Sequence, residues 1–395
     1  MRVTGTRVST TTLGEAVRAF VPHPLPPAKP ALATESFAAA ARRAELALAR
    51  LSGVAGLVPS VEWLLYSAIR KEALLTSQIE GTQATLTDLF DEEAGQSVAN
   101  TDDVEEVTNY LRAFRLVRDN LGSPTGLPIS ARLLCEAHRL LLAGARGSGK
   151  QPGELRRSQN WIGGTRPGRA MFVPPPPDRV AALLCDLERF IHDDDPGLPP
   201  LVRIALVHVQ FETIHPFLDG NGRIGRLLIA ALLEQWRLLP QPLMYLSSYL
   251  KQNQAEYYRR LSAVRTDGDW EGWVDFFLEG VEAAASDAER SIVAIASLVA
   301  SDRRRLLDAP RAGAVSLRLF EVLPLMPRFT IDQVRQRLAI TFPTATSAVK
   351  LLETLGIVTE LTGQKKNRCF SYAAYVELLA GSTADRPATS KGAHP

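Results

Sequence analysis

The sequence predicts a mainly α-helical protein with one small β-hairpin in its first three quarters, followed by a small α+β domain. Three observations carry this prediction. Apolar residues recur at spacings of three and four over most of the chain, which is typical of amphipathic helices. Strand signals are sparse before about residue 314. From there the pattern changes to short helices followed by a hairpin, which is the order of a winged-helix domain.

The composition is that of an ordinary globular protein. The 395 residues suffice for two or three domains, 46% of them are apolar, and the net charge of +2 does not demand nucleic acid or an anionic membrane as partner. Three cysteines without a C-x-x-C pair favour a reducing, cytoplasmic setting. We find neither a signal-peptide layout nor an apolar run of about 18 residues, so we expect no export and no membrane span.

We divide the chain into four parts. They are an N-terminal arm and helix (1–60), a large helical domain (61–308), a winged-helix domain (309–380) and a disordered tail (381–395). Within the first part, Met1–Leu32 contains Thr- and Pro-rich pieces and is interpreted as an extended arm, and Thr34–Leu51 has the spacing of a helix.

The next predicted helix, Val61–Ile79, ends in an unusual way. Gly81 is a natural C-cap. It leaves Glu80 in the last turn, where the helix dipole disfavours a carboxylate. From the residues alone, a solvated surface glutamate is the plainer interpretation.

The middle of the chain alternates helices with one hairpin. The hairpin strands are Asn160–Ile162 and Ala170–Val173, joined by a Gly-rich turn and ended by four prolines. The predicted helices are Asp102–Asn120, Ile129–Leu142, Asp178–Asp194, Leu201–Ile214, Leu246–Arg265 and Trp270–Leu307. The C-terminal domain is predicted from the helices Val315–Leu323, Thr330–Leu338 and Thr344–Leu355 and from a hairpin of Ile357–Leu361 with Arg368–Tyr372.

The most informative stretch is His215–Arg226, which reads HPFLDGNGRIGR and lies between two apolar segments. Gly220 and Gly222 flank Asn221, so the backbone can turn tightly and expose successive N–H groups to an anion. The following helix adds its positive N-terminal end to the same place.

The charged side chains of this stretch predict chemistry on phosphates. Arg223 and Arg226 share a helix face and oppose the helix dipole unless an anion such as a polyphosphate binds there. Asp219 is a candidate Mg²⁺ ligand, and His215 can take a proton near neutral pH. Base, metal ligand and anion cradle together are what phosphoryl or nucleotidyl transfer to a hydroxyl requires.

Simpler explanations of the stretch are less complete. Gly220–Gly225 matches the dinucleotide pattern G-x-G-x-x-G, but that pattern needs a preceding strand, and a helix precedes it here. A plain helix–turn–helix corner would explain the glycines but not His215 and the two arginines. His208 lies seven residues before His215, too far to share a metal ion, and is interpreted as a packed core histidine.

These twelve residues carry a resemblance, since His215–Arg226 matches the Fic family signature His-Pro-Phe-x-Asp-Gly-Asn-Gly-Arg-x-x-Arg. The resemblance extends over about Val61–Leu278 and implies a Fic-type helical core that transfers AMP from ATP to a Ser, Thr or Tyr hydroxyl of a target protein. It implies His215 as the base and Asp219 as the Mg²⁺ ligand. The implied nucleotide-binding residues are the anion hole of Gly220, Asn221 and Gly222, the phosphate-binding Arg223 and Arg226, and the intervening Ile224 and Gly225.

The resemblance also implies features outside the motif. Residues 61–81 would form an inhibitory helix ending in the pattern Thr76…Glu80-Gly81, with Glu80 paired to Arg226 and blocking the γ-phosphate site. The hairpin would be a flap that holds the target by strand addition. Its residues nearest the nucleotide would be Ile162, Gly163, Gly164 and Thr165. Tyr257 and Tyr258 would lie near the adenosine, although one tyrosine in the core and one at the surface is an equal reading of that pair.

Three functions remain open at this stage. They are an adenylyltransferase restrained by Glu80, the reverse hydrolase that removes AMP, and a DNA-binding regulator whose core senses nucleotide. The helix Thr344–Leu355 carries only Lys350 as a cation, although the wing adds Lys365, Lys366 and Arg368. DNA is therefore possible but not favoured as a partner, and a protein–protein or homodimer contact is equally open.

Overall fold

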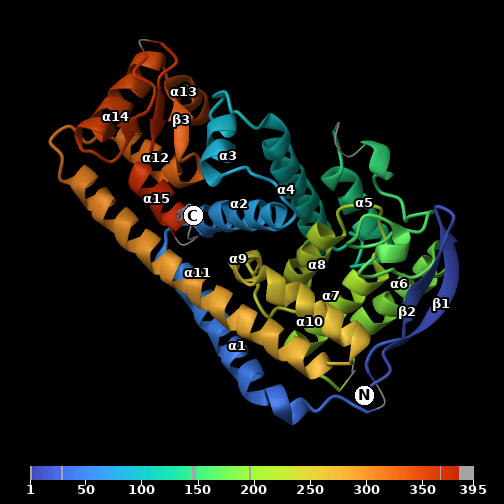
Figure 1. Cartoon of the computed structure of the whole chain (residues 1–395). Coiled ribbons are helices and arrows are strands. Elements are labelled where there is room, and N and C mark those ends of the chain that lie inside the picture. Colours follow the sequence, from blue (N-terminus) through green and yellow to red (C-terminus); the bar gives the residue numbers. More distant parts are fainter. Residues whose placement is uncertain (1, 28–29, 145–147, 195–196, 365, 382–395) are drawn as a thin grey trace, which may run out of the picture. The chain divides into compact units, whose positions relative to one another are not determined.

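The computed structural model describes residues 2–27, 30–144, 148–194, 197–364 and 366–381 (Figure 1). The chain forms two compact units that interleave in sequence. The first unit comprises Met1–Ser52, Glu72–Gln83 and Glu105–Ser286, and the second comprises Gly53–Lys71, Ala84–Val104 and Asp287–Pro395. Among the described helices, four start in one unit and end in the other: α1 (Thr34–Val54), α2 (Val61–Ile79), α4 (Thr101–Leu121) and α11 (Trp270–Leu307).

The first unit is built around α7 (Pro200–Ile214) and α8 (Asn221–Gln235), which pack on each other. Every residue of α7 after its first is buried, which explains why its sequence is apolar on all sides. Proline at the first position starts α7 where no N–H is needed. The other helices of this unit are α1 (Thr34–Val54), α5 (Ala131–Leu141), α6 (Pro177–Ile191), α9 (Ser247–Gln252) and α10 (Gln254–Thr266), with the short 3₁₀ turns η2 (Ser148–Lys150) and η3 (Pro167–Arg169).

A β-hairpin stands where the sequence predicted only an extended arm. β1 (Gly5–Thr12) pairs antiparallel with β2 (Glu15–Pro22). The two-residue turn between them has positive φ at Leu13 (50°) and Gly14 (80°), a geometry that matches the twist of a hairpin. The prediction missed it because the Pro-rich end of the arm outweighed the run of β-branched residues before the turn.

The predicted flap hairpin is present but small. Ile162 and Phe172 form a single antiparallel bridge, with hydrogen bonds of 2.8 and 3.1 Å between their backbones. Gly163 and Gly164 make its turn with φ of 68° and 76°. On the other side, the Phe20 N–H of β2 donates to the Val173 carbonyl at 2.9 Å. The N-terminal hairpin therefore continues the flap.

The second unit contains the predicted winged-helix arrangement. Three short strands form an antiparallel sheet in the order β3-β5-β4, and α12, α13 and α14 pack together beside it in the chain order of that fold. The elements are α12 (Ala314–Val322), η4 (Leu323–Leu325), β3 (Arg328–Thr330), α13 (Ile331–Leu338), α14 (Phe342–Thr354), β4 (Thr359–Glu360), β5 (Cys369–Ser371) and α15 (Ala373–Gly381). The same unit holds η1 (Ala55–Leu57) and α3 (Leu86–Glu93).

Two further predictions concern the C-terminal tail and membrane-spanning helices. The predicted disordered tail lies outside the described residues except for Gly381, which ends α15. Among the described helices, none combines the length and the apolar character needed to cross a membrane.

Candidate functional site

The predicted motif forms the loop between α7 and α8. His215 follows α7 with a left-handed backbone (φ 50°), and its N–H still donates to the Phe211 carbonyl at 2.9 Å. Gly220 precedes α8 with φ 75°, where a side chain would also approach His138 and Leu141. Two left-handed residues thus bracket the loop and turn the chain sharply between two packed helices.

The Asn221 side chain closes this loop. Its Oδ1 accepts from the Phe217 N–H and its Nδ2 donates to the Phe217 carbonyl, both at 2.9 Å. Both ends of the buried amide thus bind the Phe217 backbone and hold the loop closed. The implied anion hole of Gly220, Asn221 and Gly222 stays a prediction.

Arg156, which the sequence did not single out, holds the other end of the loop. This buried side chain donates from Nε to the His215 carbonyl at 2.8 Å and from Nη2 to the Pro175 carbonyl at 2.5 Å. Its backbone N–H donates to the Pro216 carbonyl at 2.9 Å. A buried guanidinium that satisfies several carbonyls fixes the direction in which His215 leaves its helix.

His138 on α5 supports the centre of the loop. Its Nδ1 accepts from the Gly153 N–H at 2.9 Å, so its Nε2 carries the proton and donates to the Asp219 carbonyl at 3.0 Å. The ring stacks on Phe217 with centroids 3.8 Å apart. Burial lowers the pKa of His138 to about 4, which keeps the imidazole neutral and this tautomer in place.

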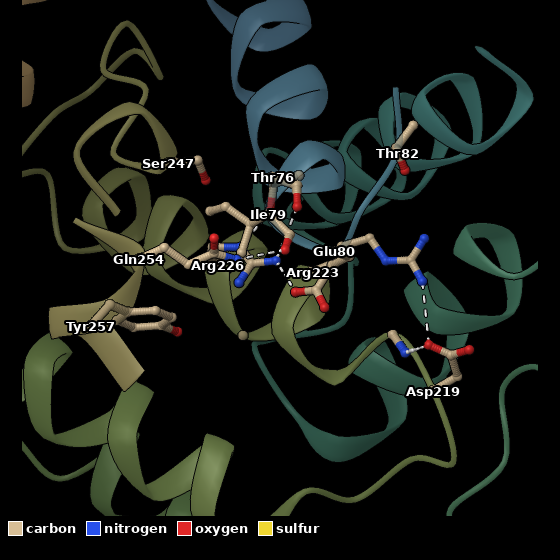
Figure 2. A network of polar contacts seen from close by, with 12 residues as sticks. Thr76, Ile79, Glu80, Thr82, Asp219, Arg223, Arg226, Ser247, Gln254 and Tyr257 are labelled. Carbon is tan, nitrogen blue, oxygen red and sulfur yellow. Dashed lines mark hydrogen bonds and ion pairs between the residues drawn. The ribbon is translucent and has the colours of Figure 1, made fainter. Parts of the chain in front are cut away.

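The first turn of α8 is the predicted anion site, and a carboxylate occupies it. No side chain caps this helix. A Cβ at Gly222 would collide with the Glu80 carboxylate and come within 3.0 Å of Arg226 Nη1. Glu80 Oε1 accepts from Arg226 Nη2 at 2.5 Å (Figure 2). The predicted pairing of Glu80 with Arg226 is thus present, directly at the helix N-terminus.

Arg226 is held from a second direction by α2. Its Nε donates to Thr76 Oγ1 at 2.6 Å and its Nη2 to the Thr76 carbonyl at 3.1 Å. The side chain is only 2% exposed. Burial alone would lower the pKa of Arg226, but the Glu80 carboxylate raises it overall, so the guanidinium stays charged.

The end of α2 is itself fastened to α9 and α10. The buried Glu72 carboxylate accepts from the backbone N–H of Ser247 at 3.1 Å and from its hydroxyl at 2.5 Å. Gln254 Nε2 donates to the Ile79 carbonyl at 3.0 Å, which satisfies one of the last carbonyls of the helix. These contacts set the position from which Glu80 reaches Arg226.

Arg223 is buried as well but pairs elsewhere. Its Nη1 lies 2.5 Å from Glu106 Oε1 on α4, and its Nη2 lies 3.5 Å from Asp219 Oδ1. Figure 2 shows the Arg223 side chain extended toward Asp219 and the Arg226 side chain directed toward Thr76 and Glu80. The two arginines start three residues apart on α8, yet each guanidinium has its own carboxylate partner.

His215 is suited to accept a proton. Burial, then the nearby charges of Arg265 and Arg156, lower the pKa of His215 to about 3, while the Glu212 carbonyl acts in the opposite direction. The imidazole is therefore neutral over the physiological range. A neutral imidazole has a nitrogen lone pair that can accept a proton, and the role of His215 as the base stays a prediction.

Asp219 is the one predicted metal ligand. Its Oδ1 accepts from the Gly220 N–H at 2.6 Å, and 47% of the side chain is exposed. Within the described residues, no group of three or more His, Cys, Asp or Glu side chains could hold a metal. A cation here would consequently need further oxygen ligands from a substrate and from water.

The tyrosine pair divides between core and surface. Tyr257 is 1% exposed, and its hydroxyl donates to His208 Nε2 at 2.8 Å, since His208 Nδ1 donates to the Gly225 carbonyl. Tyr258 is 46% exposed. The pair thus has the arrangement of one tyrosine in the core and one at the surface, and its place near an adenosine stays a prediction. His208 is the packed core histidine that was predicted.

The remaining predicted site residues fall into two groups. Ile224 and Gly225 lie within α8 on its buried side, and a side chain at Gly225 would collide with the Glu212 carboxylate. They pack the helix instead of lining its open end, which corrects that expectation. The flap is joined to the motif loop through Asn160, whose Nδ2 donates to the Phe217 carbonyl at 3.2 Å. The place of Ile162, Gly163, Gly164 and Thr165 near a nucleotide stays a prediction.

Comparisons with known proteins agree with this architecture. Residues 38–119 match the Fic/DOC family N-terminal model, and residues 128–233 match the Fic/DOC family model. Among curated relatives, the protein adenylyltransferase Fic of Drosophila ananassae is 28% identical over 211 residues, which are 52% of this chain and 39% of that protein. The namesake from Drosophila grimshawi is 32% identical over 157 residues, 40% of this chain and 29% of that protein. The chain thus spans well under half the length of these relatives.

Solved structures share the fold. A Fic family protein from Desulfovibrio desulfuricans has a TM-score of 0.53 at 21% identity and covers 84% of this chain and 95% of its own. A Fic domain containing signaling protein from Bacteroides thetaiotaomicron has a TM-score of 0.51 at 20% identity and covers 64% and 97%. The motif, the helical core around it and both family models lead to one conclusion: the chain carries an N-terminal domain and a Fic domain of the Fic/DOC family, over residues 38–119 and 128–233.

Proposed function

We propose that this chain transfers AMP from ATP to a hydroxyl group of a target protein, and that Glu80 restrains the reaction. The observation that carries the proposal is the position of the Glu80 carboxylate, which lies against Gly222 at the uncapped start of α8 and pairs with Arg226. This carboxylate accepts from the Arg226 guanidinium, a donor that a phosphate would also use. The name protein adenylyltransferase, borne by the curated relatives, supports the same reaction.

The residues have distinct roles in the proposed reaction. His215 takes the proton of the target hydroxyl as that oxygen bonds to the α-phosphorus of ATP. The bond from the α-phosphorus to its bridging oxygen breaks, and pyrophosphate leaves. Arg226 and Arg223 bind the departing phosphates once their present carboxylate partners have moved away, because a guanidinium fork matches phosphate oxygens.

Mg²⁺ fits the proposed site through Asp219. The ion commonly binds one or two carboxylates, substrate phosphates and water, and Asp219 is a half-exposed carboxylate at the mouth of the helix-terminus site. Bound there, Mg²⁺ would offset the negative charge of the phosphates.

The flap is the proposed docking place of the target. Because the Phe20 N–H of β2 donates to the Val173 carbonyl, one edge of the flap is already paired. The strand that contains Ile162 is the other edge, and an extended peptide can add to it through backbone hydrogen bonds. Such docking tolerates different sequences but fixes the register of the acceptor hydroxyl.

Labelled ATP tests the proposal. We expect Glu80→Gly protein to become labelled by ATP that carries its label on the α-phosphate and not by ATP labelled on the γ-phosphate. Glu154→Gly, which removes an exposed loop carboxylate, is the matched control and should stay as unlabelled as the wild type. Labelling by γ-labelled ATP would contradict the proposal, because it would show that a phosphoryl group and not AMP is transferred.

The same proteins distinguish AMP transfer from the reverse reaction, in which AMP is removed from the target. Glu80 is 33% exposed beside the site, so its carboxylate could also orient a water molecule. Labelled Glu80→Gly protein can be freed of nucleotide and mixed with wild-type or fresh Glu80→Gly protein. Release of AMP by the wild type alone would assign the hydrolase activity instead.

A further inference from the structure

We propose that Glu106 on α4 is a second restraining carboxylate. Glu80, in the turn after α2, restrains Arg226, and Glu106, which the same turn contacts through Thr82, restrains Arg223. The inference rests on the proposed function in one respect, namely that the phosphates of ATP are the ligands the two arginines would otherwise bind. It adds a residue from α4 to the restraint, outside both the motif and the inhibitory helix.

The contacts of Glu106 connect Arg223 to that segment. Glu106 Oε1 lies 2.5 Å from Arg223 Nη1, and the same oxygen accepts from Thr82 Oγ1 at 3.0 Å. Arg223 and Thr82 are buried, and Glu106 is largely so. One carboxylate oxygen thus receives a charged donor from α8 and a hydroxyl donor from the residue two positions after Glu80.

Glu80 and Thr82 belong to one rigid turn. Their backbone N–H groups both donate to the Ser77 carbonyl, at 3.0 and 3.2 Å, and the Gly81 N–H donates to the Gln78 carbonyl at 3.1 Å. Gly81 makes the turn possible with φ 105°. A movement of this turn that withdraws Glu80 from Arg226 would therefore also withdraw Thr82 from Glu106.

The charges explain why this matters for a phosphate ligand. Arg223 has its Nη1 engaged by Glu106 and its Nη2 near Asp219. A phosphate that binds Arg223 must displace the Glu106 carboxylate or lie beside a like charge, and either event weakens binding. Removing Glu80 alone consequently frees only one of the two arginines.

Nucleotide affinity tests this inference without requiring transfer. We compare Glu80→Gly with Glu80→Gly/Glu106→Gln by calorimetric titration with ATP, and with adenosine as the ligand without phosphates. Loss of the competing charge should tighten ATP binding by about tenfold, which equals about 1.4 kcal/mol. Adenosine affinity should not change, because Glu106 competes only for the phosphate-binding donors.

Glu105→Gln in the same background is the matched control. Glu105 is the exposed neighbour of Glu106 on α4, so its replacement removes an equal charge without touching Arg223. Glu106→Ala provides a second variant with the same expected direction, and a cooperative thermal transition verifies that each variant is folded.

The outcomes separate the inference from the proposed function. If ATP binds Glu80→Gly and the added Glu106→Gln leaves its affinity unchanged or weaker, Glu106 merely orients Arg223, and the inference is overturned. If neither variant binds ATP at millimolar concentration, the proposed function is overturned together with it. Tighter binding of ATP with unchanged binding of adenosine supports both the inference and the proposed function.

Discussion

Glu80 and Arg226, 146 residues apart in the chain, form an ion pair of 2.5 Å at the N-terminus of α8. The pair joins the end of α2 to the helix that follows the motif loop. It places a carboxylate where backbone N–H groups and a buried guanidinium converge, so the anion site already contains an anion supplied by the chain itself. In the proposed reaction, both this contact and the contact of Glu106 with Arg223 must open before a nucleotide phosphate can bind the two arginines.

Arg226→Lys tests whether the planar set of N–H donors of a guanidinium is needed at this position. Arginine contacts Thr76 with two nitrogens while it holds Glu80, and a lysine ammonium cannot reproduce that planar geometry. In the Glu80→Gly background, we expect Arg226→Lys to weaken ATP binding by about tenfold or more in a calorimetric titration. Arg259→Lys, an exposed arginine on α10, is the control that should leave the affinity unchanged.

Arg156→Ala tests the anchoring of the motif loop. The substitution leaves the buried carbonyls of Pro175 and His215 without their donor. We expect the free energy of unfolding, measured by urea denaturation, to fall by about 2–5 kcal/mol. Arg157→Ala, an exposed neighbour, should change it by less than about 0.5 kcal/mol. Equal effects of the two variants would show that Arg156 does not anchor the loop.

Tyr257→Phe tests the assignment of this tyrosine to the core. The variant removes the hydroxyl that donates to the buried His208 Nε2 and leaves the ring in place. We expect a loss of about 1 kcal/mol in the free energy of unfolding and no change in ATP affinity in the Glu80→Gly background. A weaker affinity for ATP with unchanged stability would return Tyr257 to the nucleotide site.

Acid should destabilise the fold, because the buried His138 and His208 and the half-buried His215 are held neutral. Burial lowers the pKa of His138 to about 4 and those of His208 and His215 to about 3. In the unfolded chain a histidine titrates at about 6.5. Between these values the unfolded state binds more protons than the native state, so the free energy of unfolding falls as the pH falls, by up to about 1.4 kcal/mol per pH unit for each histidine.

Glu212 works in the opposite direction. Burial raises the pKa of Glu212 to about 7, against about 4.3 in an unfolded chain, so between these values the native state binds the extra proton. Its contribution to stability therefore grows as the pH falls. We expect Glu212→Gln to make the loss of stability between about pH 7 and about pH 5 steeper, as measured by urea denaturation at several pH values. A shallower loss in the variant would contradict this assignment.

The sequence predicted those parts that depend on local signals. The motif loop, the position of Glu80 after α2 and the three winged-helix helices follow from glycine placement and apolar spacing, which the structure repeats. The winged-helix boundaries, for example, agree within a few residues because Gly356 and Thr330 are strong local stop and start signals.

Contacts between distant segments were not predictable in this way. Arg156 lies in a polar stretch beside Arg157, and nothing in one sequence distinguishes the buried arginine from the exposed one. Glu106 likewise resembles its exposed neighbour Glu105 until α4 is placed beside α8. The burial of Tyr257 follows from a hydrogen bond to a histidine 49 residues away, which no spacing rule reports.

The measurement that tests the account most directly is self-labelling of Glu80→Gly protein with α-labelled ATP, with and without the additional change His215→Ala. The account predicts strong labelling of the single variant, background labelling of the double variant, and equal ATP affinity for both, because His215 carries the proton and does not hold the phosphates. Equal labelling of the two variants would contradict the assignment of His215 as the base and, with it, the proposed reaction at this loop.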